Sequence, residues 1–310
     1  MAVSKTQTII VAEDNRQAAL EMIAASLAFA TMGCIAHAFR DQVTWSMVAF
    51  IRIVVTAIMS LLMLHFRRAP FLVVGTPALW WRSIFGSVGI LCGFYALSQL
   101  PITDVVTIMS TTPIWVTIML AVVFRQRIPV ATWGYALLAL AGVYIMQRPS
   151  FDADSLPIGI ALFGAFVVAT VKISLGYCRN LPPVSIVTHY AICASIVSLF
   201  VTFVVRDGVI VLNPEMSPWF WLWLVPMGLA GTVGQLFMTG AYGKGKTNTV
   251  ALVGISQIAF AAIYDAVLWQ RYFDLPKLIG VVMITVAIAA TISARDKTPL
   301  PKTDRDEAMP

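Results

Sequence analysis

The chain contains the same sequence unit twice, and this repeat limits its fold more than any single motif. Residues 101–126 and 244–271 each begin with a short turn, continue as an apolar segment and end on a glutamine next to arginine. The two ends read Arg125-Gln126-Arg127 and Trp269-Gln270-Arg271. A repeat of such a long period indicates a fold built from two similar halves.

The composition places these halves in lipid. Hydrophobic residues make up 59% of the chain and charged residues only 12%, which excludes a water-soluble domain with a polar surface. The net charge is +6, but Lys and Arg occur in short clusters between apolar runs. This spacing is typical of membrane-protein loops and argues against a nucleic-acid partner. The four cysteines lie in apolar stretches at unrelated spacings, so we expect no disulfide frame, metal site or other cofactor.

The apolar runs predict ten membrane-spanning helices, because about 20 apolar residues are needed to cross the hydrocarbon core. The predicted spans are 20–39, 45–66, 82–100, 102–124, 130–146, 156–177, 183–205, 219–242, 249–269 and 275–294. The loops on the side of the N-terminus hold most of the Lys and Arg residues, so both termini, residues 1–19 and 295–310, are expected in the cytoplasm. Arg82 and Lys172 lie near span ends, where we expect them to snorkel to the surface. Arg52 lies deeper.

The repeat and the span count together predict an inverted duplication. Shifting the sequence by about 145 residues places Ala96 on Ala241 and Val105 on Val250. This match divides the spans into two units, 20–148 and 156–294. Five spans per unit is an odd number, so the second unit enters the membrane in the opposite orientation. We therefore expect an all-α integral membrane fold with a solute site between the halves, near the middle of the membrane.

Several local motifs resemble the EamA-type transporters of the drug/metabolite transporter superfamily. They are Tyr95-Ala96-Leu97, the turn at Leu100-Pro101, Pro113 within a span, Phe124-Arg125-Gln126-Arg127, Trp133-Gly134, and Arg52 between two isoleucines on the second span. The resemblance covers about residues 20–294. It implies a ten-helix bundle that moves small metabolites across the cell (inner) membrane. Members commonly carry a Gly-Glu-Arg-like turn where this chain has Gln126 and Gln270.

Arg52 is the leading candidate for a functional residue. A charge inside the hydrocarbon region is costly, so it persists only with a partner or beside a wet cavity. Arg52 is therefore expected to contact a substrate carboxylate or a cluster of helix carbonyls. The alternative is a structural salt bridge or a long snorkelling side chain. Asp265, near the outer end of the ninth span, is a candidate partner, and its alternative is a carboxylate that reaches the interface.

Polar and aromatic residues at helical spacing predict the walls of a solute chamber. The members are Tyr95 and Gln99 on the third span, Trp115 on the fourth, Gln235, Thr239 and Tyr242 on the eighth, and Gln257 and Tyr264 on the ninth. Such a chamber suits an amphipathic, zwitterionic solute. Each residue alone also fits packing or helix–helix hydrogen bonding.

Glu21 and His189 are candidates for a proton relay, since both lie near span ends and His titrates near neutral pH. The alternative is an ordinary interfacial side chain.

Transport explains the duplication, the span count and the sparse buried polar groups together. An intramembrane enzyme needs a nucleophile with its base or a metal cluster, and the spans carry no such pattern. A membrane adaptor or sensor is expected to add a sizeable soluble domain, and the loops here are short. Export of amino acids or related metabolites is the first hypothesis. Uptake of a vitamin or nucleoside-like metabolite, of the riboflavin or S-adenosylmethionine type, is the second. The expected partners are the solute and the bilayer, and the chain is expected to act as a monomer or homodimer.

Overall fold

The computed structural model describes residues 14–38, 45–71, 76–151, 155–205, 218–268 and 274–294, and all elements within them are α-helices. The helices of the first half are α1 Asn15–Ala38, α2 Trp45–Arg67, α3 Pro77–Gln99, α4 Ile102–Met109, α5 Thr112–Val122 and α6 Val130–Gln147. Those of the second half are α7 Ser155–Tyr177, α8 Pro183–Val205, α9 Pro218–Lys244, α10 Thr247–Val253, α11 Ser256–Leu268 and α12 Leu275–Ser293. Gln270, residues 1–13 and the tail at 295–310 lie outside the described ranges.

The predicted multi-pass helical fold is confirmed. Within the described ranges, nine helical segments are long and apolar enough to cross a membrane, counting α4 with α5 and α10 with α11 as one segment each. The predicted third span corresponds to α3, which is not among these nine. α3 is 23 residues long, carries two tryptophans and an arginine near its start, and packs within the same bundle. At 23 residues, α3 is long enough for a tenth crossing.

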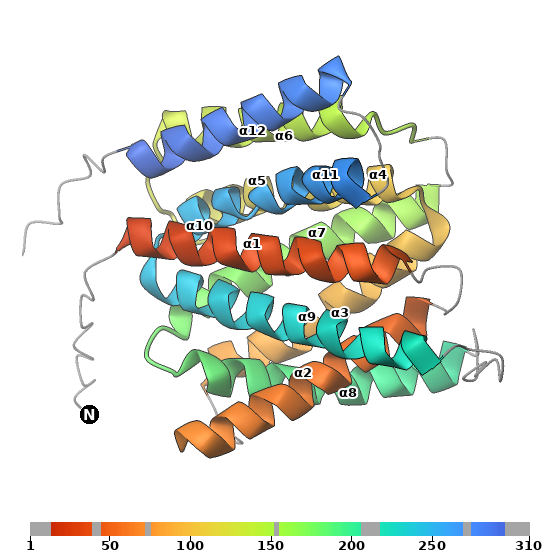
Figure 1. Cartoon of the computed structure of the whole chain (residues 1–310). Coiled ribbons are helices and arrows are strands. Elements are labelled where there is room, and N and C mark those ends of the chain that lie inside the picture. Colours follow the sequence, from red (N-terminus) through yellow and green to blue (C-terminus); the bar gives the residue numbers. More distant parts are fainter. Residues whose placement is uncertain are drawn as a thin grey trace, which may run out of the picture.

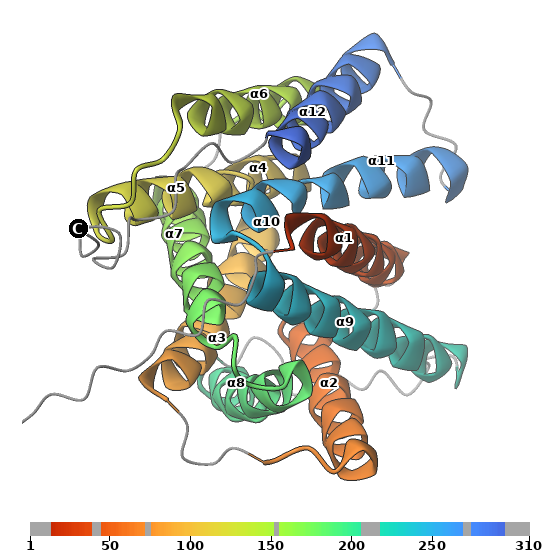
Figure 2. The same cartoon turned by 90° about the vertical axis from the view of Figure 1, so that its left-hand side faces the viewer.

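The two halves are related by exchange of equivalent helices. α1 packs against α9, and its counterpart α7 packs against α3, the counterpart of α9. The remaining main contacts join counterparts directly, α2 with α8 and α6 with α12. In Figure 2 the α6–α12 and α2–α8 pairs form opposite edges of the bundle, and the α1–α9 and α3–α7 pairs lie on either side between them. Exchanging the halves therefore reproduces the packing.

Equivalent helices run in opposite directions. The Oδ1 of Asn15, at the start of α1, accepts a hydrogen bond of 2.9 Å from the backbone N–H of Lys246. The Nη2 of Arg179, just after α7, donates one of 3.0 Å to the carbonyl of neighbouring Gly245. The start of α1 and the end of α7 thus lie together (Figure 1). We call this the basic end, because Arg67, Arg179 and Lys244 gather there.

The opposite end carries the acidic residues Asp104 and Asp274, and we call it the Asp274 end. Arg148 pairs with Asp274 at 3.0 Å. The carboxylate of Asp104, in the first turn of α4, accepts hydrogen bonds of 3.1 Å from the backbone N–H groups of Ser150 and Phe151. Asp104 is fully buried, so its role is to anchor the connection between the halves.

Two equivalent spans are interrupted near their middle. The first breaks between α4 and α5 at Ser110 and Thr111, and the second breaks between α10 and α11 at Gly254 and Ile255. The hydroxyls of Ser110 and Thr111 donate to the carbonyls of Val106 and Ile108, at 2.6 and 2.7 Å, and the same carbonyls also accept from the backbone N–H groups of these two residues. Interrupted helices with free ends inside a membrane are typical of transporter sites.

α6 and α12 approach each other through a reciprocal glycine contact. A Cβ added to Gly142 would lie 2.8 Å from the carbonyl oxygen of Gly280, and a Cβ added to Gly280 would lie 2.5 Å from that of Gly142. Both distances are shorter than real Cβ contacts. Only glycine permits this spacing, because the obstructing atoms belong to backbone.

Candidate functional site

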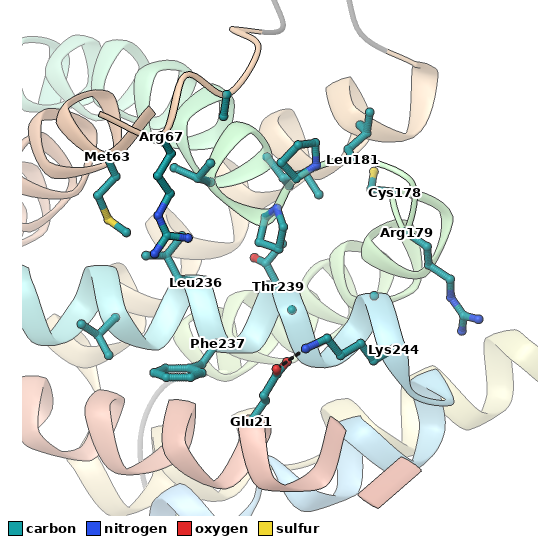
Figure 3. A pocket seen from close by; sticks show the side chains of 18 residues that line it. Glu21, Met63, Arg67, Cys178, Arg179, Leu181, Leu236, Phe237, Thr239 and Lys244 are labelled. Atoms are coloured by element: carbon teal, nitrogen blue, oxygen red, sulfur yellow. Dashed lines mark hydrogen bonds and ion pairs between the residues drawn. The ribbon is translucent and has the colours of Figure 1, made fainter. Parts of the chain in front are cut away.

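A cavity of about 580 Å³ opens at the basic end. Its walls come from α1 and α2 of the first half and from α8, α9 and the α7–α8 turn of the second (Figure 3). Most of the lining is apolar, with side chains such as Leu236, Phe237 and Ile186. The cavity therefore lies between the two halves, but at the basic end of the bundle and not near its middle, where the sequence predicts the solute site.

The charges around the cavity are mainly positive. Arg67, Arg179 and Lys244 contribute three cations, and Glu21 is the one carboxylate among the lining residues. Glu21 Oε1 pairs with Lys244 Nζ across the α1–α9 contact, as the dashed line in Figure 3 shows. Glu21 Oε2 is buried without a hydrogen-bond partner, and an added Cβ at Gly240 would lie 2.8 Å from it. Gly240 thus makes room for the carboxylate against α9.

The predicted polar face of α9 is buried in the bundle. Thr239 lines the cavity, is only 2% exposed, and its hydroxyl has no partner. Tyr242 is fully buried, and its hydroxyl also has no partner. Gln235, one turn deeper than Thr239, accepts a hydrogen bond of 2.9 Å from Nη2 of Arg82. The arrangement leaves buried polar atoms unpaired, which a bound solute or water would satisfy.

Arg82 does not snorkel, and that expectation is wrong. Its side chain is 2% exposed and points into the bundle, where the guanidinium lies over the ring of Tyr190 at 4.0 Å. Nε has no partner, and no carboxylate in the described part of the chain pairs with the guanidinium. The reason is local: Gly86, one turn later on α3, leaves the space that Arg82 Nη1 occupies. A neutral amide and an aromatic ring therefore hold a buried cation.

Arg52 lies on α2 and is half-buried. Its side chain packs against α9 at Gly231, where an added Cβ would lie 3.4 Å from Nε. Tyr190 lies near Arg52, and its ring contacts the guanidinium of Arg82. Among the described residues, no ion pair joins Arg52 to Asp265. Asp265, on α11, instead lies near Cys34 of α1.

The interrupted spans carry two of the predicted chamber residues, Trp115 and Gln257. Trp115, in the first turn of α5, packs edge-on against Phe166 of α7 at 5.7 Å, and its Nε1 is buried without a partner. Ser256, in the first turn of α11, also has a buried hydroxyl without a partner. Gln257 follows it and is exposed. α5 and α10 are in contact, so the two breaks lie on the same side of the bundle.

The remaining chamber residues lie toward the Asp274 end. Tyr264, on α11, shares a hydrogen bond of 2.7 Å with the hydroxyl of Thr31 on α1. Tyr95 is half-buried and Gln99 is exposed in the last turns of α3. The predicted chamber is thus spread along the bundle, from Thr239 near one end to Gln99 at the other.

His189 and Glu21 do not share a described contact. His189 is 5% exposed, its Nδ1 lies 2.7 Å from the hydroxyl of Ser83, and its ring packs edge-on against Trp80. It joins α8 to α3, whereas Glu21 joins α1 to α9. Gln126 is exposed in the loop after α5, where its backbone N–H donates to the carbonyl of Leu120.

Sequence reasoning missed three residues of this region, namely Arg82, Ser256 and Thr31. Arg82 follows two tryptophans, and that pattern indicates an interfacial position. The signal that Arg82 is buried is Gly86 at i+4, on the same helix face. For Ser256 the signal is Gly254, which lies in the second repeat where Ser110 lies in the first.

Comparison with known protein families gives a match over both halves. The model of the EamA-like transporter family matches residues 17–148 and again residues 155–293. The pseudopaline exporter CntI of Pseudomonas aeruginosa is 23% identical over 273 residues, covering 86% of this chain and 93% of that protein. An uncharacterized transporter of Helicobacter pylori is 21% identical, covering 85% of this chain and 90% of that protein.

The fold also occurs among solved structures. One crystal structure superposes with a TM-score of 0.74 at 14% sequence identity, covering 90% of this chain and 96% of that one.

Proposed function

Because the chain belongs to the EamA-like transporter family, we propose that it exports small organic metabolites, foremost amino acids and related amphipathic compounds. The names of the family and of the relatives indicate a transporter rather than an enzyme. The substrate class, the direction and the residues in contact with solute belong to the proposal.

The observation that carries the proposal is the cavity between the inverted halves. Its volume of about 580 Å³ lies within the usual range for small-molecule sites, about 300–1,000 Å³. Alternating access requires a site that two similar halves can expose to either side in turn. The two halves make equivalent contacts, since α1 packs against α9 as α7 packs against α3.

The loop charges support a cytoplasmic opening of the cavity. Basic residues gather where the cavity opens, and basic loops of membrane proteins remain in the cytoplasm. The proposed orientation has the basic end and both termini in the cytoplasm of the cell whose inner membrane holds the protein. The cavity then loads from the cytoplasm. The exporter CntI, 23% identical, adds support from a relative.

The interior suits a solute with a carboxylate and an apolar body. Arg52 lies within the membrane without a described carboxylate beside it, so we assign it the substrate carboxylate. Trp115 and Gln235 supply an aromatic wall and an amide, and Gln257 and Tyr264 line the proposed path beyond the breaks. Glu21, with its unpartnered oxygen at the cavity, is the proposed proton-coupling group.

The test is solute flux in liposomes that contain the purified protein. A panel of amino acids, amino-acid derivatives, vitamins and nucleoside-like compounds is measured with and without an imposed pH gradient. The proposal predicts saturable flux of an amino-acid-like solute, absent from protein-free liposomes. Flux confined to vitamins or nucleoside-like compounds would contradict amino acids as the substrate class and favour the second hypothesis. No movement of any solute under any gradient would contradict transport of this panel.

A further inference from the structure

We propose that Arg82 is a second anion-binding group, located behind the inner wall of the cytoplasmic cavity, which exchanges Gln235 for a carboxylate of the solute. The inference rests on the proposed function and adds to it the residue that selects carboxylates at this wall. Three observations lead to it.

The first observation is the electrostatic environment of Arg82. The guanidinium is 2% exposed, lies over the ring of Tyr190, and has two neutral hydrogen-bond partners, Gln235 Oε1 and the side chain of Tyr190. No described carboxylate pairs with it, and its Nε is unsatisfied. A buried cation with neutral partners is destabilised, so an anion that reaches it gains a strong, charge-assisted interaction.

The second observation is the position of Arg82 directly behind the cavity lining. Cys178 lines the cavity and is also an electrostatic neighbour of Arg82. Ile186, another lining residue, lies one turn before Tyr190 on α8. Thr239, also in the lining, lies one turn after Gln235 on α9, toward the end of that helix. Four residues of helix rise about 6 Å, so Gln235 lies about 6 Å deeper along α9 than Thr239, behind the lining residue Leu236.

The third observation is the unpartnered hydroxyl of Thr239. It is 2% exposed, lines the cavity and has no hydrogen-bond partner. A solute carboxylate between Thr239 and Arg82 would accept from both groups. The neutral amide of Gln235 holds Arg82 in place until a carboxylate replaces it.

The position of Gln235 allows a test that separates solute binding from helix packing. In Gln235→Glu the new carboxylate pairs with Arg82 within the protein and competes with the solute. We expect the KM for a carboxylate solute to rise about 10-fold or more, which is the effect of one charged hydrogen bond. If the Arg82–Gln235 bond serves packing alone, Gln235→Glu preserves it and leaves KM unchanged.

The charge preference of transport gives the second measurement. A transported amino acid is compared with its carboxamide in liposomes that contain the wild type, Arg82→Gln, Gln235→Glu or Ser87→Ala. Ser87 is buried on α3 and bonds only to the carbonyl of Ser83, so it controls for loss of a buried polar group on that helix. We expect the wild type and Ser87→Ala to prefer the carboxylate, and Arg82→Gln to reduce that preference about 10- to 100-fold.

The outcomes separate this inference from the proposed function. Wild-type flux with equal handling of acid and amide, or an unchanged KM in Gln235→Glu, overturns the role of Arg82 and leaves transport intact. Absence of wild-type flux for the whole panel overturns the proposed function and this inference with it. If Arg82→Gln fails to insert, Gln235→Glu still decides, because it removes no positive charge and keeps the shape of the side chain.

Discussion

Two guanidinium groups inside the bundle, those of Arg52 and Arg82, are the strongest functional signals in single residues. Each costs several kcal/mol in a hydrocarbon environment unless something compensates the charge, about 2.5–3.5 kcal/mol on insertion scales. The partners seen within the described residues are neutral: the ring of Tyr190 contacts Arg82, Gln235 accepts a hydrogen bond from Arg82, and Tyr190 also lies near Arg52. We therefore propose that both guanidinium groups bind an anion.

Arg52→Ala is expected to abolish flux while the protein still inserts into the membrane. Removing the cation removes the proposed partner of the solute carboxylate but relieves a buried charge, so folding is not impaired. The measurement is flux in liposomes beside the yield of monodisperse protein. Arg68→Asn is the matched control, because Arg68 is exposed in a loop at positive φ, which Asn tolerates. Wild-type flux in Arg52→Ala would refute the role given to Arg52.

Glu21 and Lys244 are expected to stabilise the contact of α1 with α9 as a coupled pair. Glu21→Gln and Lys244→Met each remove one partner of a partly buried ion pair, with side chains 18% and 40% exposed. The double variant should lose less stability than the sum of the single variants, with a coupling of about 0.5–1 kcal/mol. Thermal unfolding in detergent measures the cycle. Strictly additive losses would show that the pair contributes no coupling.

Sequence reasoning reached some of these residues and missed others for physical reasons. Arg52 stands out because no charged residue lies near it in an apolar span, and Gln235 and Thr239 stand out by helical spacing. Arg82 was misplaced because its distance from the span end fits snorkelling, and only the side-chain direction shows that it is buried. Glu21 and Lys244 are 223 residues apart in sequence, so their pairing depends on how α1 and α9 pack, and local patterns carry no such information.

Among the helices, the interrupted spans and the α6–α12 crossing determine the architecture. Span positions were predictable, since apolar length and charged boundaries decide them. The break at Gly254 was not, because an isolated glycine within an apolar run is compatible with a continuous helix. Comparison with the Ser110 break in the first half is needed to recognise it.

Gly280→Ala is expected to destabilise the protein by about 1–3 kcal/mol, because its Cβ meets the carbonyl of Gly142 and the side chain of Met146. Gly134→Ala, on α6, is the matched control. An added Cβ there meets nothing within 4 Å, and alanine favours the helix by up to about 1 kcal/mol. Thermal unfolding should therefore shift down for the first variant and remain unchanged or rise for the second. Equal shifts would contradict the close α6–α12 contact.

The proposed transport function needs two inverted halves, and the proposed orientation places the basic end of the molecule in the cytoplasm. The inverted arrangement was predictable from an odd number of spans per repeat. The cavity was not, because it depends on how α1, α2, α8 and α9 meet.

The proposed orientation predicts opposite labelling of two single cysteines in a variant without Cys34, Cys92, Cys178 and Cys193. Gln126→Cys lies in an exposed loop after α5, and Leu275→Cys is exposed at the start of α12 on the other end. A membrane-impermeant maleimide added to intact cells with a permeable outer envelope should label only Leu275→Cys. Labelling of Gln126→Cys alone would reverse the orientation and make the cavity an external opening.

Passage of solute through the cavity is tested most directly by thiol labelling of a lining residue, because a bound solute protects the lining from the reagent. Leu236→Cys is half-buried in the cavity lining, and Gln126→Cys, in the exposed loop after α5 at the same end of the bundle but outside the lining, is its control. In inside-out membrane vesicles, we expect an impermeant thiol reagent to label both cysteines, and we expect the transported solute to slow the labelling of Leu236→Cys alone. Labelling of Leu236→Cys that is unchanged by saturating transported solute would contradict the claim that solute passes through this cavity.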